Sequence, residues 1–188
     1  HLFKPAKKTT KKFTITHISS LLDKHKNISG MLRVAKQLEN TIDTFQWNFI
    51  GGKKEEFSKL LDDLNFKKET IHFTDHLSHE QIPKQLTQSD VFVLFSNYEN
   101  LPCVILEAFS CGVPVISSNV GGINEFFPED FGFLIEQNNE DQLLQKIIEI
   151  YNNPMSRSKK MHQFANDNFS SEIICDSFSK LYLQAINK

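Results

Sequence analysis

Short apolar stretches alternate with helical patterns along almost the whole chain. Runs of β-branched and aromatic residues predict strands at 13–18, 45–50, 71–73, 91–95, 113–117 and 133–135. Between them, apolar residues at helical spacing predict helices at 28–42, 54–64, 102–111 and 140–152, a helix opened by Ser78, and helical structure over 155–187 after a break near Pro154. This alternation is typical of an α/β protein with an open parallel sheet of about six strands and helices on both faces.

The stretch 91–95 is apolar without interruption, as in a strand that is buried on both faces of a parallel sheet. Open parallel sheets bind ligands at the carboxyl ends of their strands, so functional residues are expected in the turns at 19–26, 51–53, 74–77, 96–102 and 118–122. No GxGxxG follows the first strand, and GxxxxGK[ST] occurs nowhere in the sequence. The chain therefore lacks the motifs that identify NAD-binding and P-loop proteins.

Composition narrows the class further. The chain has 188 residues, of which 39% are hydrophobic, and this favours a single domain around one core. The net charge of -2, with interspersed charges, disfavours a nucleic-acid binder. Three cysteines without CxxC spacing disfavour a disulfide framework or a structural zinc site and favour a reducing cytosol. No apolar run approaches the roughly 20 residues of a membrane span, and the start at His1 suggests a piece of a longer protein.

The turn and helix after the apolar strand combine several features of an anion site. Pro102 suits the first helical position, and the amides from about Cys103 onward are expected to point into the crevice. The helix dipole adds roughly half a positive charge there, which favours a phosphate or diphosphate. Glu99 and Glu107 flank this site, and a carboxylate can accept two hydrogen bonds from a vicinal diol. Spacing alone leaves the alternative open that Glu99 is a capping residue and that Glu107 lies on a solvated helix face.

The motifs that follow make the pattern specific. After the E-x7-E pair Glu99 and Glu107 come Ala108-Phe109-Ser110-Cys111-Gly112-Val113-Pro114-Val115-Ile116 and Val120-Gly121-Gly122-Ile123-Asn124-Glu125. This combination resembles the retaining glycosyltransferases of group 1, or family 4, which have the two-domain GT-B fold. The resemblance extends from about Phe3 to Lys188 and corresponds to one half of such an enzyme. It implies an interdomain linker ending in residues 1–12, a Rossmann-like nucleotide-sugar-binding domain at 13–153, and C-terminal helices at 154–188 that pack toward an N-terminal domain.

The resemblance also implies roles for individual residues. Glu99 would bind hydroxyls of the donor sugar and stabilise charge near the anomeric carbon, and Glu107 would bind the ribose diol. The backbone of Asn100, Leu101, Pro102 and Cys103 would hold the sugar and the diphosphate. The family usually has Gly at the position of Asn100, whose side chain would narrow the sugar pocket.

Three other turns contribute expected donor contacts. Lys26 would neutralise the leaving diphosphate and is expected, with Glu99, to be catalytic; an ordinary surface lysine is the alternative. Ser20 stands where the family has an Arg, a loss for which Lys24, His25 or another domain would have to compensate. By the same resemblance, His76 and Leu77 would read the nucleobase through their backbone. Gly52 would let the backbone approach the ligand closely, although a plain strand-to-helix turn explains it equally well.

The implied reaction transfers a hexose-type sugar from a UDP- or GDP-sugar to a glycan or lipid-linked acceptor that binds through the missing domain. No metal or other cofactor is expected, since neither Asp-x-Asp nor HExxH occurs. The expected location is the cytoplasm, with peripheral association at the inner face of the membrane left open. We expect the 188-residue chain to bind nucleotide without turnover. The rival interpretations are another GT-B enzyme, such as an epimerase or a phosphorylase, and a non-catalytic nucleotide-sugar-binding module.

Overall fold

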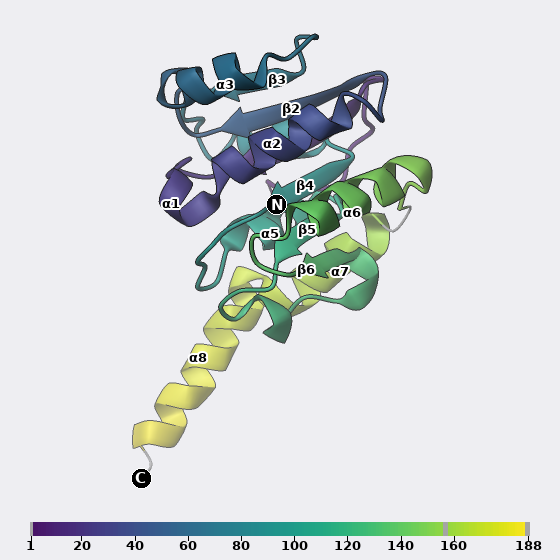
Figure 1. Ribbon diagram of the computed structural model, residues 1–188. Helices are drawn as coiled ribbons and strands as arrows, with labels where there is room; N and C mark the ends of the chain where they lie inside the picture. Colours follow the sequence, from purple (N-terminus) through teal and green to yellow (C-terminus); the bar gives the residue numbers. More distant parts are fainter. Residues whose placement is uncertain (1, 156–157, 187–188) are drawn as a thin grey trace.

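The computed structural model describes residues 2–155 and 158–186 (Figure 1). Its six parallel strands form one sheet in the order β3-β2-β1-β4-β5-β6. The strands are β1 (Phe13–Ile18), β2 (Phe45–Ile50), β3 (Ile71–Thr74), β4 (Val91–Leu94), β5 (Val115–Ser118) and β6 (Gly132–Ile135). The predicted α/β class and the open parallel sheet are confirmed.

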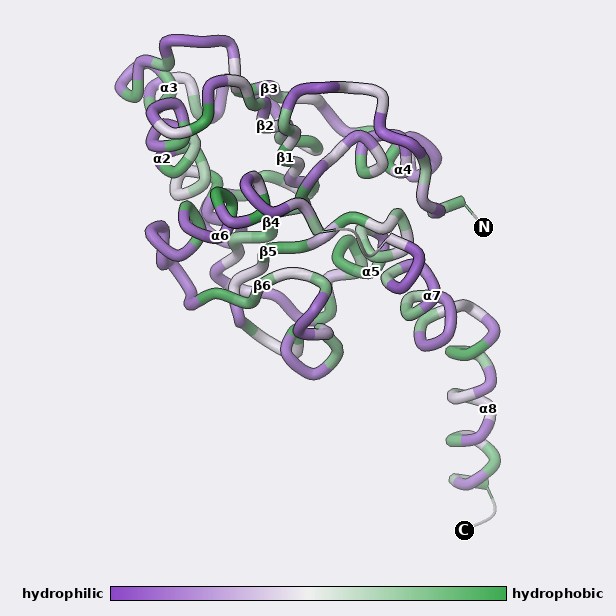
Figure 2. The backbone as a smooth tube through the Cα atoms, turned by 90° about the vertical axis from the view of Figure 1, so that its right-hand side faces the viewer, coloured by the Kyte–Doolittle hydropathy of each residue, from purple (hydrophilic) through white to green (hydrophobic). Residues whose placement is uncertain are grey.

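Helices cover both faces of this sheet. They are α1 (Asp23–Lys26), α2 (Ile28–Leu38), α3 (Ser58–Leu64), α4 (Ile82–Leu86), α5 (Cys103–Ser110), α6 (Glu140–Asn152), α7 (Ser158–Phe169) and α8 (Ser171–Ile186), with short 3-10 turns η1 (Lys54–Phe57), η2 (Ile123–Glu125) and η3 (Glu129–Phe131). Figure 2 shows α2, α3 and α6 on one side of the sheet and α4, α5 and α7 on the other. The sheet is therefore the middle layer of three.

The sequence of the central strand β4 is apolar throughout because the strand lies between two hydrophobic cores. Val91 and Val93 belong to the core cluster beneath α2 and α6, whereas Phe92 and Leu94 belong to the cluster beneath α5 and α7. All four side chains are completely buried. Alternate side chains of a strand point to opposite faces, so a strand with a hydrophobic core on each side needs apolar residues at every position.

Several element boundaries differ from the predictions. The helix expected at 28–42 ends at Leu38, and the one expected at 54–64 is divided into η1 and α3. The segment opened by Ser78 is a turn, with regular helix only from Ile82, and the strand expected at 113–117 begins at Val115. The C-terminal region forms two helices that separate at Ser170, while residues 156, 157 and 187 of the predicted span lie outside the described residues.

Helix α8 packs little against the rest of the chain, and none of its described residues is buried. It projects from α7 away from the body of the molecule (Figure 1). Its large apolar side chains are mostly exposed: Ile173, Ile174, Phe178, Leu181, Tyr182, Leu183 and Ile186. Within the described ranges, no helix is long and apolar enough to cross a membrane. The packing of these helices against an N-terminal domain stays a prediction.

Candidate functional site

The sheet reverses its direction of growth between β1 and β4. The chain proceeds from β1 through β2 to β3 on one side, and from β4 through β5 to β6 on the other. The turns that leave the carboxyl ends of β1 and β4 therefore face each other across a crevice, where open α/β sheets bind their ligands. The backbone N–H of Asn97 donates to the carbonyl oxygen of His25 at 2.7 Å, and its side-chain amide donates to that of Lys24 at 3.1 Å. Two of the predicted functional turns thus touch directly.

Lys26 and Glu99 meet at this contact. The Lys26 Nζ lies 2.5 Å from Glu99 Oε1, and the Ser96 hydroxyl donates to the same oxygen at 2.6 Å. The Glu99 side chain is 8% exposed and that of Lys26 19%. A carboxylate at this depth requires partners of this kind because burial removes most of its hydration. The two residues predicted to be catalytic therefore form one partly buried ion pair.

Backbone conformation in the turn after β1 brings Lys26 to this position. Leu21 and Asn27 both have left-handed conformations, with φ of 53° and 49°. The Ser19 hydroxyl accepts a hydrogen bond from the Leu21 N–H at 3.0 Å, and the Asn27 side chain caps α2 by accepting from the Gly30 N–H at 3.2 Å. The short helix α1, which the sequence did not predict, lies between these two residues and ends at Lys26.

His17, which was not among the predicted site residues, ties the two sides of the crevice together. Its Nδ1–H donates to the Val93 carbonyl oxygen at 2.9 Å, and its Nε2 accepts from the Ser19 hydroxyl at 2.7 Å. Burial lowers the pKa of His17 to about 4, against the raising effect of the hydrogen bond to Val93, and the charge of Lys26 lowers it further. A neutral imidazole therefore links β1 to β4. The signal in the sequence was a histidine near the carboxyl end of a predicted strand.

Helix α5 begins four residues after Glu99. Pro102 precedes the helix with φ of -74° and ψ of 98°, and no side chain caps it, so the first amides stay available. Gly121, with φ of +60°, lies so close to this segment that a Cβ there would clash with the Glu99 carbonyl oxygen. Asn100 and Leu101 are exposed, as is Cys103. The predicted anion site is thus open to solvent and supported from β5.

The turn after β3 reaches the same helix farther along. His79 Nε2 lies 3.2 Å from Glu107 Oε1, and Leu77 packs into the core cluster beneath α5. His76 is exposed next to them. The predicted ribose-binding carboxylate and the predicted base-binding turn are therefore neighbours.

Two predicted residues are less clearly placed at the crevice. Ser20 is exposed, and its side chain forms no hydrogen bond within the part of the chain that the structure describes. Gly52 is buried against Leu21, whose side chain lies 3.0 Å from the position that a Cβ of residue 52 would take. This packing gives a sufficient reason for glycine there, and the contact of its backbone with a ligand stays a prediction.

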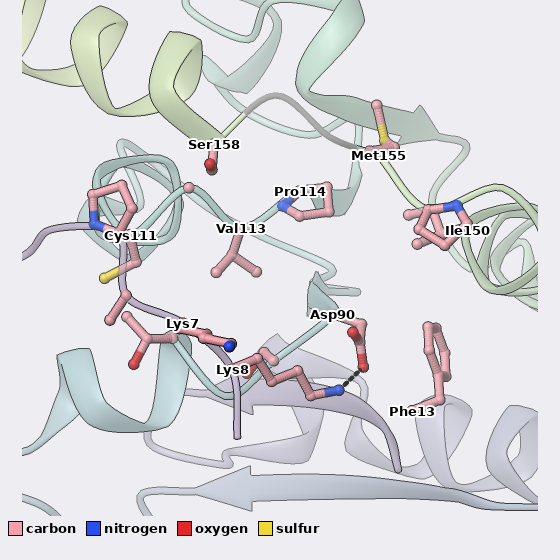
Figure 3. Close-up of a pocket in the computed structure, with 16 residues that line it drawn as sticks. Lys7, Lys8, Phe13, Asp90, Cys111, Val113, Pro114, Ile150, Met155 and Ser158 are labelled. Atoms are coloured by element: carbon pink, nitrogen blue, oxygen red, sulfur yellow. Dashed lines mark hydrogen bonds and ion pairs between the residues drawn. The ribbon is translucent and has the colours of Figure 1, made fainter. Parts of the chain in front are cut away.

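A cavity of about 400 Å³ lies at the opposite, amino-terminal edge of the sheet (Figure 3). Its lining includes Phe13, at the start of β1, and Val113, just before β5. Asp90 accepts from the Lys8 ammonium group and from the Thr14 N–H. These polar groups satisfy one another, and parallel sheets bind ligands at the other edge, so the turns that carry Lys26 and Glu99 remain the candidate site.

Comparison with known proteins agrees with this architecture. Residues 2–168 match the model of the family described as "Glycosyl transferases group 1". The UDP-Gal:alpha-D-GlcNAc-diphosphoundecaprenol alpha-1,3-galactosyltransferase of Escherichia coli is 40% identical over 89 residues, which are 47% of this chain and 22% of that protein. The chain spans less than half the length of the first curated relatives that it matches.

Solved structures share the fold. A sucrose-phosphate synthase from Thermosynechococcus elongatus superposes with a TM-score of 0.85 at 23% identity, covering 99% of this chain and 50% of that one. The pneumococcal O-GlcNAc transferase GtfA in complex with UDP and GlcNAc superposes with a TM-score of 0.74 at 18% identity, covering 99% and 39%. The chain belongs to the glycosyltransferases of group 1, and its six-stranded parallel sheet has the Rossmann-like fold of the GT-B glycosyltransferases.

Proposed function

We propose that this chain is the donor-binding domain of a retaining glycosyltransferase that takes a hexose-type sugar from a UDP- or GDP-sugar. The observation that carries the proposal is the Lys26–Glu99 ion pair in front of the open N-terminus of α5. A cation and a set of free amides suit a diphosphate, and a carboxylate next to them suits the hydroxyls of an attached sugar. Glu107, farther along the same helix, suits the ribose.

The geometry supports the following division of labour. The diphosphate lies at the amides of Cys103 and its neighbours and takes the ammonium group of Lys26. Glu99, released from Lys26, accepts hydroxyls of the sugar and stabilises the positive charge that develops at the anomeric carbon as the diphosphate leaves. The backbone of 100–103 encloses the sugar, and the backbone of His76 and Leu77 contacts the base. This arrangement meets the charge of the leaving group with protein groups, so we propose that transfer requires no metal ion.

The acceptor is proposed to bind outside this chain. A glycan or lipid-linked acceptor would approach the sugar from a preceding domain, against which α8 would place its exposed apolar residues. Residues 1–12 would be the end of the connecting linker, residues 13–153 the donor domain and residues 154–188 the helices that pack back toward the preceding domain. Two relatives are named for lipid-linked acceptors, and we propose the cytoplasmic face of a membrane as the location.

Isothermal titration calorimetry of the 188-residue chain with UDP, GDP and their sugars tests the proposal. We expect one of the two nucleotides to bind, Glu107→Ala to weaken it, and no sugar transfer without the acceptor domain. Binding of neither nucleotide would contradict the proposal, and turnover by the isolated chain would contradict its division between two domains.

The exposed Ser20 favours a second candidate, a non-catalytic nucleotide-sugar-binding module. The family position of Ser20 carries an Arg, and a phosphate site with fewer cations stabilises a leaving group less. If the full-length protein bound the nucleotide sugar but neither transferred nor hydrolysed the sugar with any acceptor, this second candidate would be preferred.

A further inference from the structure

His79 contacts the carboxylate that is proposed to hold the ribose. Its Nε2 lies 3.2 Å from Glu107 Oε1, and because an ionised carboxylate only accepts hydrogen bonds, His79 is the donor. The Glu107 side chain is 23% exposed and that of His79 68%. Oε2 of Glu107 has no hydrogen-bond partner within the described residues. One carboxylate oxygen is therefore held by the protein, and the other remains available to a ligand.

The His79 ring also contacts an aromatic side chain. Phe3 packs partly buried against the core cluster beneath α5, and its ring centroid lies 5.0 Å from that of His79 at an interplanar angle of 56°. Within the turn that carries His79, the Ser78 N–H donates to the Gln81 side chain at 2.9 Å and the Ser78 hydroxyl to Glu80 at 3.1 Å. The contacts with Phe3 and Glu107 together favour one orientation of the exposed imidazole.

We propose that His79 is a positioning residue for nucleotide recognition. It fixes the rotamer of Glu107 so that the free oxygen accepts the hydroxyls of a ribose cis-diol. Phe3, in the segment that leads into the domain, holds the imidazole in place. The proposal rests on the assignment of Glu107 to the ribose, and it adds a residue of the turn after β3 to that subsite.

The test compares two ligands that differ only in the diol. Calorimetry identifies the tighter binder of UDP and GDP, and then measures its affinity relative to its 2′,3′-dideoxy analogue. The ratio of the two affinities reports the diol contact alone. Glu107→Ala should bring the ratio close to one. His79→Ala should lower it about fivefold, as expected for the loss of one hydrogen bond. His79→Gln, which keeps an N–H donor near the position of Nε2, should restore it.

Lys84→Ala serves as the matched control because Lys84 lies exposed on α4, just beyond this turn, and its side chain contacts neither His79 nor Glu107 in the part of the chain that the structure describes. If His79→Ala keeps the wild-type ratio while Glu107→Ala removes it, the role of His79 is disproved and the proposed function stands. If Glu107→Ala keeps the ratio, the ribose assignment itself fails. An equal loss in Lys84→Ala, or no recovery in His79→Gln, would show that the effect does not come from the His79 hydrogen bond and would overturn the proposal.

Discussion

The ammonium group of Lys26 and the carboxylate of Glu99 lie 2.5 Å apart and neutralise each other where the turns after β1 and β4 meet. In the proposed complex the same two groups bind different parts of the donor, the diphosphate and the sugar. A donor must therefore separate them. When the diphosphate binds Lys26, Glu99 loses its ionic partner, and the sugar hydroxyls replace it. A complete nucleotide sugar should therefore bind more tightly than a free nucleotide.

Glu99→Gln is expected to tighten the binding of the free nucleotide. The amide that replaces the carboxylate carries no charge and does not form an ion pair with Lys26. The diphosphate can therefore bind the Lys26 ammonium group without leaving a buried carboxylate unpaired. We expect Kd for the nucleotide to fall about three- to tenfold, which corresponds to the net contribution of one ordinary hydrogen bond, and the advantage of the nucleotide sugar to shrink. Calorimetry measures both, and Glu125→Gln, which removes an exposed carboxylate on η2, is the control. Unchanged or weaker nucleotide binding in Glu99→Gln would contradict the coupling.

Lys26→Met is expected to destabilise the fold as well as to weaken nucleotide binding. It leaves the largely buried Glu99 with the Ser96 hydroxyl as its remaining partner, at a cost of about 2 kcal/mol in the free energy of unfolding. The double variant Lys26→Met/Glu99→Gln should recover most of this loss, because it removes the unpaired charge. Urea denaturation of the three variants measures the coupling, and additive effects would show that the pair does not interact.

The lowered pKa of the buried His17 should make the stability of the fold depend on pH. Its pKa is about 4 in the folded chain and about 6.5 when unfolded, so between these values the unfolded state binds the extra proton. The free energy of unfolding should therefore fall as the pH decreases from about 6.5 to about 4, by up to about 3 kcal/mol, and this contribution should stay constant below that range. His17→Asn, which keeps a donor toward the Val93 carbonyl, should lack this component. Equal slopes in both proteins would contradict it.

Two adjacent glycines provide a matched pair for the turn that supports Glu99. Gly121→Ala adds a Cβ at φ of +60° against the Glu99 carbonyl oxygen, whereas at Gly122 the nearest atom is 3.5 Å from the added carbon. We expect Gly121→Ala to lower the free energy of unfolding by about 2 kcal/mol or more and to weaken nucleotide binding. Gly122→Ala should change neither strongly. Thermal melting and calorimetry compare the two variants. Equal stability and equal nucleotide affinity in both would show that the close contact between Gly121 and the Glu99 carbonyl oxygen is unimportant.

The elements with the clearest hydrophobic periodicity were predictable because the face that each element buries requires apolar residues at regular positions. The unbroken run of β4 and the apolar spacing of Ile28, Met31 and Ala35 in α2 follow from the faces that they bury. Boundaries were less predictable where a single turn decides them. Helix α1 depends on the left-handed conformations of Leu21 and Asn27. Helices α7 and α8 separate at Ser170, where the sequence has no glycine or proline that would predict a break.

The sequence by itself determined the alternation of strands and helices, and its motifs singled out Glu99, Glu107 and Lys26 as candidates. Only the tertiary structure decided which of these residues touch. Lys26 meets Glu99 across 73 positions of sequence, and His17 meets Val93 across 76. These contacts exist because β1 lies beside β4 in the sheet. The hydrogen bonds between strands are made by backbone groups that every residue possesses, so strand order follows from the packing of both cores and leaves no local pattern in the sequence.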